Sequence, residues 1–157
     1  MGVSGCGKST VGELLAEEIS GVFYDGDDYH PQSNIDKMAN GIPLTDHDRQ
    51  PWLEKLASVI REGSSPSVTA CSALKKSYRD TLRTAGDVTI VYLQGSQQLL
   101  LERLTERSLK TDHFMSSNML DSQLETLEDP SSEAGVVTVS IEHSPQDLVS
   151  QLTKKLS

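Results

Sequence analysis

The first ten residues of the chain, MGVSGCGKST, include the residue types best suited to hold a phosphate group. Residues 2–9 match the pattern G-x-x-x-x-G-K-[ST] in full. The glycines allow consecutive backbone N–H groups to turn toward phosphate oxygens, and a helix beginning near Lys8 would direct its positive dipole end at the same anion. Lys8 would reach the β- and γ-phosphates of a nucleotide, and the Ser9 hydroxyl would bind Mg²⁺. The pattern predicts a nucleotide-binding loop but leaves the phosphoryl acceptor unidentified.

Carboxylates that could activate an acceptor follow the apolar run GVFY, in the segment DGDDYHP. If this segment is extended, Asp25 and Asp27 face one side and Asp28 faces the other, because side chains alternate along a strand. One carboxylate could then act near Mg²⁺, directly or through water, and the other could accept the proton of an attacking hydroxyl. A solvated turn whose aspartates cap a helix is an alternative that these residues alone leave open.

Basic residues occur where a phosphoryl-transfer site would need them. Arg49 lies at a predicted helix start, and Arg103 and Arg107 are four residues apart on another predicted helix. A further group follows a predicted strand and consists of Lys75, Lys76, Arg79 and Arg83. We interpret Lys76 and Arg83 as parts of a solvated basic face, which is also the alternative for each other member.

Composition excludes several classes of partner. The chain has 157 residues and a formal net charge of -9, which argues against a nucleic-acid or anionic-membrane surface. The sequence shows neither a signal peptide nor an apolar run near the roughly 18 residues that a membrane helix needs. Cys6 and Cys71 form no CxxC pair, and the histidines are too scattered to suggest a metal site. We expect a cytoplasmic protein that forms a single domain over residues 1–157.

The elements that must position these residues alternate between strands and helices. Apolar spacing predicts helices over residues 8–19, 48–63, 75–86, 96–109, 119–128 and 145–156. Short apolar runs predict strands over residues 21–25, 67–74, 87–95 and 136–142. The second helix is expected to open near Pro51, because proline favours the first turn. This alternation indicates βαβ units and therefore an α/β fold with a parallel sheet.

Several separate motifs, in order over nearly the whole chain, resemble gluconate kinase (gluconokinase), of the shikimate-kinase-like branch of P-loop kinases. They are GVSGCGKST, YDGDDYHPQSNIDKMANGIPLTDHDRQPWL, CSALKKSYRD, HFM and QLETLEDP. Shikimate kinase itself fits less well, because CSALKK replaces its glycine-rich substrate loop. Adenylate kinase fits less well still, because the chain has no room for its larger lid.

The resemblance implies a three-layer P-loop kinase fold, with a parallel sheet flanked by helices. It also implies transfer of the γ-phosphoryl group of ATP to the 6-hydroxyl of D-gluconate, with ATP and Mg²⁺ as cofactors. D-gluconate would be the small-molecule partner, with no nucleic acid and no membrane, and the family tends to form homodimers. The substrate-binding segment would span about 27–62 and the lid about 104–118.

The resemblance also assigns roles to individual residues. Lys8, Asp27 and Arg107 would be catalytic, with Asp27 as the general base. Ser9 and Asp25 would bind the metal. Residues expected to contact ATP are Gly2, Ser4, Gly5, Cys6, Gly7, Lys8, Ser9, Thr10 and Arg103. Residues expected to contact D-gluconate are Asp27, Arg49, Lys75, Arg79 and Gln123. An arginine suits this acid because its planar guanidinium can bind a carboxylate through two hydrogen bonds.

The lid departs from the family pattern. The family is expected to have a short link of the form R-x-G-H-F, whereas this chain has RSLKTDHF, which is longer and lacks the glycine. Closure of a lid expels water and completes the charge around the phosphoryl group. An altered hinge is therefore expected to change turnover while leaving nucleotide binding intact.

A second departure concerns the start of the fold. In the relatives a hydrophobic strand precedes MGVSG and lies in the centre of the sheet, between the strands bearing CSAL and TIVYL. Here the first, central strand is expected to be missing, which would leave backbone groups of two neighbours unpaired. An artificially shortened sequence, a true isoform, or a sheet that closes around the gap would each explain this. The alternative function is a truncated, inactive isoform that acts as a binding or regulatory partner.

Overall fold

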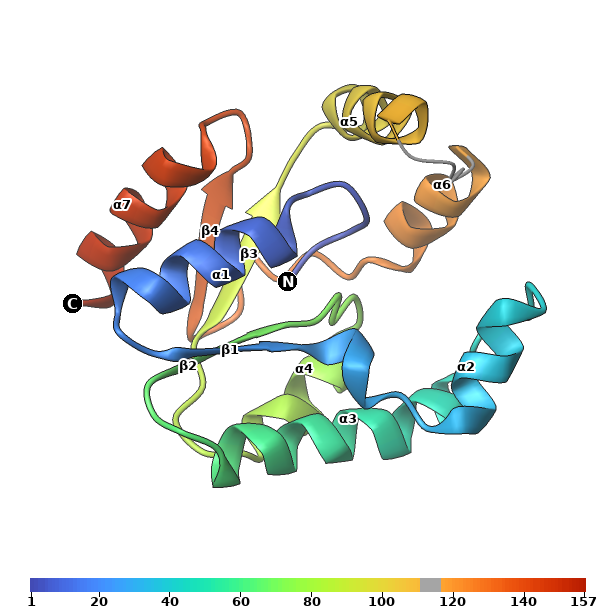
Figure 1. The fold of residues 1–157 in the computed structure, drawn as a ribbon, viewed down its shortest axis with the longest axis horizontal. Coiled ribbons are helices and arrows are strands. Elements are labelled where there is room, and N and C mark those ends of the chain that lie inside the picture. The colour runs from blue at the N-terminus through green and yellow to red at the C-terminus, as the bar shows by residue number, and fades with distance from the viewer. Residues whose placement is uncertain (111–116) are drawn as a thin grey trace.

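The computed structural model describes residues 1–110 and 117–157, in which short strands alternate with helices as predicted (Figure 1). The strands are β1 (Val22–Asp25), β2 (Ser67–Ala70), β3 (Ile90–Gln94) and β4 (Val136–Ser140). The helices are α1 (Lys8–Glu18), the 3₁₀ helix η1 (Gly26–Tyr29), α2 (Gln32–Ala39), α3 (Asp46–Glu62), α4 (Lys76–Arg83), α5 (Gln97–Lys110), α6 (Ser117–Thr126) and α7 (Pro145–Leu156). Helices α1 and α7 pack together on one side of the strands, and α3 and α4 pack together on the other (Figure 1). This is the predicted α/β arrangement of parallel strands flanked by helices.

The strands form two parallel pairs, β1 with β2 and β3 with β4. In the described residues β2 and β3 do not pair with each other. The first two residues lie between the pairs: the Leu93 N–H donates to the Met1 carbonyl at 3.0 Å, and the Gly2 N–H donates to the Ser72 carbonyl at 3.2 Å. The predicted gap in the sheet is therefore confirmed in the described residues, and it lies between β2 and β3. The alternative, a sheet that closes around the gap, is wrong.

A cavity of about 430 Å³ occupies this gap. Apolar side chains from both helical layers line it, including Leu15 of α1, Leu82 of α4 and Leu152 of α7. Backbone groups line its edges, because successive residues of a strand direct their N–H and C=O groups to opposite neighbours. The Ile90 N–H donates to the Gly135 carbonyl, on the side of β3 that faces β4. The N–H and C=O groups of the next residue, Val91, therefore face the cavity.

The apolar core is divided in the same way. One buried cluster surrounds α1 and α7 and includes Leu15, Leu100 and Leu148. The other lies between α3 and α4 and is centred on Trp52 and Leu56. A central strand would contribute side chains to both clusters, because a strand covered on both faces carries apolar residues in succession.

Helix α3 begins earlier than predicted. It starts at Asp46, and Pro51 lies inside it, so the prediction of an opening near Pro51 is wrong. The Thr45 hydroxyl accepts from the Asp48 N–H at 3.1 Å, and the Asp48 carboxylate accepts from the Thr45 N–H at 2.9 Å. This reciprocal capping box stabilises the start of the helix and determines its first residue.

Filling the cavity with a strand should stabilise the protein. We expect that five apolar β-branched residues joined directly ahead of Met1 raise the melting temperature by about 5 °C or more, because they bury apolar surface and pair with β2 and β3. Calorimetric unfolding of the unaltered and extended chains measures the difference.

The matched control is an extension of equal length in which proline replaces alternate residues and removes their N–H donors. Equal stabilisation by both extensions would show that the gain does not come from strand pairing.

Candidate active site

The phosphate-binding loop precedes α1 directly. Gly5 and Gly7 adopt φ values of +85° and +91°, a region in which residues other than glycine are strained. Gly7 is the N-cap of α1 and has no side chain to cap the helix, so the N–H groups of the first turn are available to an anion. Ser9 and Thr10 are exposed on that turn. The loop therefore has the backbone geometry that a nucleotide phosphate requires.

Lys8 lies across this loop. Its ammonium donates to the carbonyl oxygens of Gly2 at 3.0 Å and Val3 at 3.1 Å, and Cys6 is buried beneath it. Phosphate oxygens would compete for the same N–H donors. The loop is also attached to α6, because the Ser4 N–H donates to the side-chain oxygen of Gln123 at 2.7 Å. Gln123, predicted to contact substrate, therefore lies against the nucleotide loop.

The acidic segment differs from the extended geometry predicted for it. Residues Gly26–Tyr29 form η1, so the alternation that would make Asp25 and Asp27 face one side does not apply. Instead, the Asp25 carboxylate caps η1 by accepting from the Asp27 N–H at 3.0 Å, which matches the capping alternative. The Asp27 side chain is 89% exposed. A glycine is needed at position 26 because an added Cβ would lie 2.4 Å from the Ala70 carbonyl oxygen.

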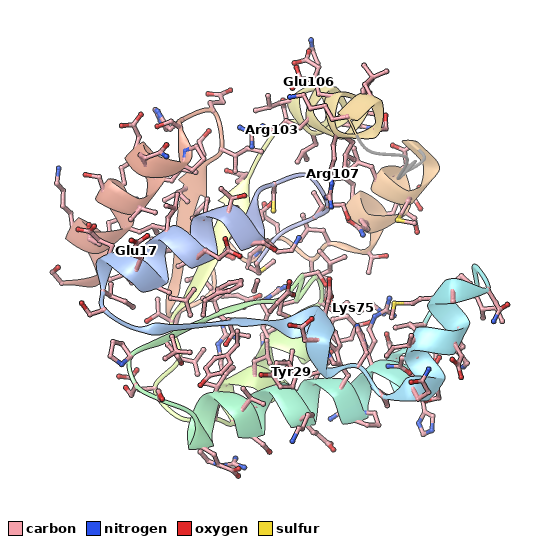
Figure 2. All side chains as sticks on the ribbon, in the orientation of Figure 1. Glu17, Tyr29, Lys75, Arg103, Glu106 and Arg107 are labelled. Atoms are coloured by element: carbon pink, nitrogen blue, oxygen red, sulfur yellow. The ribbon has the colours of Figure 1, made fainter. Side chains whose placement is uncertain are left out.

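Arg49 and Lys75 are brought together around Tyr78. The Arg49 guanidinium carbon lies 5.7 Å from the centre of the Tyr78 ring, and the Lys75 ammonium lies 5.8 Å from it. Lys75 lies near η1 in Figure 2. Lys75 also pairs with Asp46 at 3.0 Å, and the Tyr78 hydroxyl donates to the same carboxylate. We call Arg49, Lys75, Tyr78 and Asp46 the Tyr78 cluster.

The cluster affects the ionisation of its own members. Burial, with the hydrogen bond to Asp46, raises the pKa of Tyr78 to about 12. Hydrogen bonds from Tyr78 and then Lys75 lower the pKa of Asp46. Tyr78 therefore stays a neutral donor and Asp46 an anion at neutral pH. Sequence reasoning missed both residues, although they lie within the motifs KKSYRD and LTDHDR.

Arg79 is fully buried and has a different environment from the one predicted. Its guanidinium donates to the carbonyl oxygens of Ala73 at 2.8 Å, Leu74 at 3.0 Å and Glu128 at 2.9 Å, and it pairs with Glu133 at 2.5 Å. These bonds join the loop after β2 to the loop after α6. Contact between Arg79 and a substrate stays a prediction, and in this structure the side chain holds two loops together.

The two arginines of α5 lie at different places. Arg103 donates to the Ile141 carbonyl at 2.6 Å, at the end of β4. Arg107 is exposed and lies on the side of α5 nearer the phosphate-binding loop (Figure 2). Part of the predicted lid, including the HF pair at 113–114, lies outside the described residues.

The described residues include oxygen ligands of the kind that Mg²⁺ prefers. In residues 1–110 and 117–157 there is no group of three or more His, Cys, Asp or Glu side chains that could hold a metal ion alone. Mg²⁺ bound to nucleotides needs fewer protein ligands, because it keeps several waters and phosphate oxygens. The exposed Ser9 hydroxyl and the Asp25 carboxylate at the end of β1 are oxygen ligands of the required type. Over the same residues no helix is long and apolar enough to cross a membrane.

The phosphate-binding loop at the start of α1, beside the carboxyl ends of parallel strands, defines a P-loop nucleotide-binding fold, and the comparisons with known proteins place it among kinases. The sequence profile described as shikimate kinase matches residues 4–157. Among curated relatives, the thermosensitive gluconokinase of Escherichia coli (strain K12) is 42% identical over 96% of this chain and 82% of its own length. The gluconokinase of Arabidopsis thaliana is 38% identical over 100% of this chain and 90% of its own length. The chain belongs to the gluconokinase branch of the shikimate kinase family.

Solved structures agree with this assignment. The crystal structure of a gluconokinase from Sinorhizobium meliloti 1021 has a TM-score of 0.86 and 44% identity, covering 99% of this chain and 92% of the other. Shikimate kinase from Aquifex aeolicus shares the fold, with a TM-score of 0.62 at 20% identity. The match covers 99% of this chain and 92% of the other. The predicted family and fold are confirmed.

Replacing Arg79 with methionine should destabilise the protein by about 3 kcal/mol or more, because it leaves Glu133 and three carbonyl oxygens without their buried donor. Chemical denaturation measures this. The control is Lys76→Met on the same helix, where the side chain is 58% exposed and the expected loss is below about 1 kcal/mol. Equal losses for both variants would contradict the assigned structural role of Arg79.

The same ion pair should make stability depend on pH. Hydrogen bonds from Arg79 hold the pKa of Glu133 below its usual 4.5. The stabilisation by this ion pair is therefore complete above pH 4.5, and it is lost as pH falls through the lower pKa that Glu133 has in the folded state. Denaturation at several pH values should show that the stability difference between the unaltered protein and Glu133→Gln narrows on acidification. A difference that stays constant down to pH 3 would contradict this.

Proposed function

We propose that this protein transfers the γ-phosphoryl group of ATP to the 6-hydroxyl of D-gluconate, forming 6-phospho-D-gluconate and ADP. The observation that carries the proposal is the position of three groups at the same ends of the strands. The phosphate-binding loop donates to Ser72 just after β2, Asp27 follows β1, and Lys75 follows β2. The carboxyl ends of parallel strands are where α/β folds bind their ligands. The names of the relatives support gluconate as the acceptor.

The loop would hold the nucleotide. Backbone N–H groups at the start of α1 would bind phosphate oxygens, and Lys8 would exchange the Gly2 and Val3 carbonyls for the β- and γ-phosphates. Ser9 and Asp25 would hold Mg²⁺, which neutralises phosphate charge when bound. The remaining loop residues and Arg103 keep their predicted role as nucleotide contacts.

The acceptor would be activated and held by separate groups. Asp27, whose carboxylate is exposed on η1, would accept the proton of the 6-hydroxyl. Arg49 and Lys75 would bind the carboxylate at the far end of the sugar acid, because two cations over one ring form a site for an anion. A substrate with the acid group at one end and the reacting hydroxyl at the other would thereby be oriented.

Other roles extend the same proposal. Arg107 would neutralise charge on the transferring group when a lid over 104–118 closes, and the substrate-binding segment would span 27–62. Gln123 would couple α6 to the nucleotide loop through Ser4. We further propose a single catalytic domain over 1–157 in a cytoplasmic protein, with a homodimer as its expected assembly.

Changing Asp27 to Asn should lower turnover with D-gluconate by roughly 100- to 10,000-fold, because the amide cannot accept the hydroxyl proton. The measurement is ADP release by the purified chain with Mg-ATP and D-gluconate. ATP affinity, followed by the thermal shift that Mg-ATP produces, should be retained in this variant.

Shikimate and the absence of an acceptor serve as controls. Turnover that Asp27→Asn leaves unchanged would remove this residue from the mechanism. An unaltered chain that binds Mg-ATP without using gluconate would refute gluconate as the acceptor. A chain with no thermal shift at all would support the inactive binding partner instead.

Replacing Arg49 with methionine should raise the KM for D-gluconate about 10- to 100-fold, because the substrate carboxylate loses a charged hydrogen-bond donor. The KM for ATP should not change. Steady-state kinetics separates the two constants, and Arg61→Met, a change at an exposed position of the same helix, is the matched control. Similar effects of both variants would show that Arg49 does not hold the acid group.

A further inference from the structure

His30 lies between the acidic segment and α3, and the proposed mechanism gives it no role. Its side chain is only 6% exposed and stacks on Trp52, with ring centroids 4.1 Å apart and an interplanar angle of 18°. The indole N–H of Trp52 donates to the Gly26 carbonyl at 2.7 Å. The imidazole ring is therefore fixed against a side chain that is itself bonded to η1.

The hydrogen bonds of Asn34 determine where the imidazole proton lies. The Asn34 side chain is buried, and its amide nitrogen donates to the Asp48 carbonyl at 2.9 Å. A carbonyl can only accept, so the nitrogen and not the oxygen of the amide must face it. The same nitrogen lies 3.3 Å from Nδ1 of His30, and because an amide nitrogen can only donate, Nδ1 must accept. Neutral His30 therefore carries its proton on Nε2.

This proton is directed at the acidic segment. Nε2 of His30 lies 4.0 Å from Oδ1 of Asp27. A movement of roughly 1 Å would bring the two atoms within hydrogen-bond distance, and catalytic hydrogen bonds are often long before substrate binds. The polar contacts thus run from the Asp48 carbonyl through Asn34 and His30 to Asp27.

Burial, rather than the neighbouring charges, favours the neutral form of His30. Asp27 faces it from η1 and Arg49 faces it from α3, while the Asp48 carboxylate is paired with Lys37 at 2.8 Å. Burial lowers the pKa of His30 below 6.5, and Arg49 adds to this while Asp27 opposes it. Protonation would also place an Nδ1–H donor against the Asn34 donor. Near pH 7 the ring thus offers Asp27 a neutral N–H.

We propose that His30 is a positioning residue that orients the carboxylate of Asp27 through its Nε2–H, with Asn34 fixing the tautomer. One carboxylate oxygen is held by His30, which leaves the other for the acceptor hydroxyl. His30 keeps its proton throughout, and the proton of the hydroxyl passes to Asp27. The inference rests on the proposed function in taking Asp27 as the general base, but the orientation of His30 can be measured without turnover.

The first test is spectroscopic. Long-range ¹H–¹⁵N correlation spectra of the purified chain near pH 7.5 should show the Nε2–H tautomer of His30, and Asp27→Asn should shift its Nε2 resonance. Asn34→Asp should move the proton to Nδ1 or protonate the ring, because a carboxylate accepts where the amide donates. An Nδ1–H tautomer in the unaltered chain, or no response to Asp27→Asn, would overturn the proposal.

The second test is kinetic and uses a matched pair of variants. His30→Phe retains the stacking on Trp52 but has no N–H, and His30→Gln retains an N–H donor near the position of Nε2. We expect kcat with D-gluconate to fall about tenfold in His30→Phe, with the KM for ATP unchanged, and to stay within about threefold in His30→Gln. Melting temperatures check that both variants fold.

A double-mutant comparison separates this proposal from the proposed function. In an Asp27→Asn background, His30→Phe should cause no further loss, because the carboxylate that it orients is gone. Equal losses in the Phe and Gln variants, or an unchanged loss in the Asp27→Asn background, would overturn the role of His30. If the unaltered chain did not use gluconate, the proposed function would fail, whereas the spectra would still decide the orientation of His30.

Discussion

The backbone hydrogen bonds of Met1 and Gly2 are the connection on which the candidate site depends. Met1 pairs with β3 and Gly2 donates to Ser72 after β2, so two consecutive residues join the two pairs of strands. The phosphate-binding loop continues directly from them. The distance between the loop, on one half, and the acidic segment with the Tyr78 cluster, on the other, is therefore determined at this connection. Arg79 supports it by joining the loops after β2 and α6.

Charge is distributed so that an acidic protein can receive two anions. The chain has a formal net charge of -9, which would repel ATP and gluconate at long range. Cations are concentrated locally, with Lys8 on the loop and Arg49 beside Lys75 at Tyr78. Asp46 pairs with Lys75 at 3.0 Å, so this cluster contains two cations and one carboxylate and stays positive. Local groups at a few ångströms outweigh distant ones, because salt screens interactions beyond roughly 10 Å.

Local patterns predicted the features that depend on neighbouring residues. The start of α1 at Lys8 and the strand ending at Asp25 follow from the loop motif and the apolar run before the aspartates. The capping box of α3 is also visible in the sequence, as Thr45 and Asp48 three residues apart, and it determines the start of the helix more strongly than the preference of Pro51 for a first turn. The 3₁₀ geometry of η1 was missed because DGDD is compatible with either a turn or an extended segment.

Contacts between distant segments could not be predicted in the same way. Glu133 lies 54 residues from Arg79, and no periodicity connects them. The tautomer of His30 depends on a carbonyl of α3 reached through Asn34, which only the folded arrangement brings close. The resemblance identified the family, which is confirmed, but it could not show which basic side chains already bond to protein acceptors. The bounds of the substrate-binding segment and of the lid stay predictions.

The cavity between the strand pairs has a consequence for the volume of the protein. Unfolding eliminates internal voids, so the partial volume of a chain falls when water fills them, and hydrostatic pressure then favours the unfolded state. The cavity of about 430 Å³ between the strand pairs, with apolar side chains from both helical layers on its walls, therefore makes the unfolding of this chain sensitive to pressure.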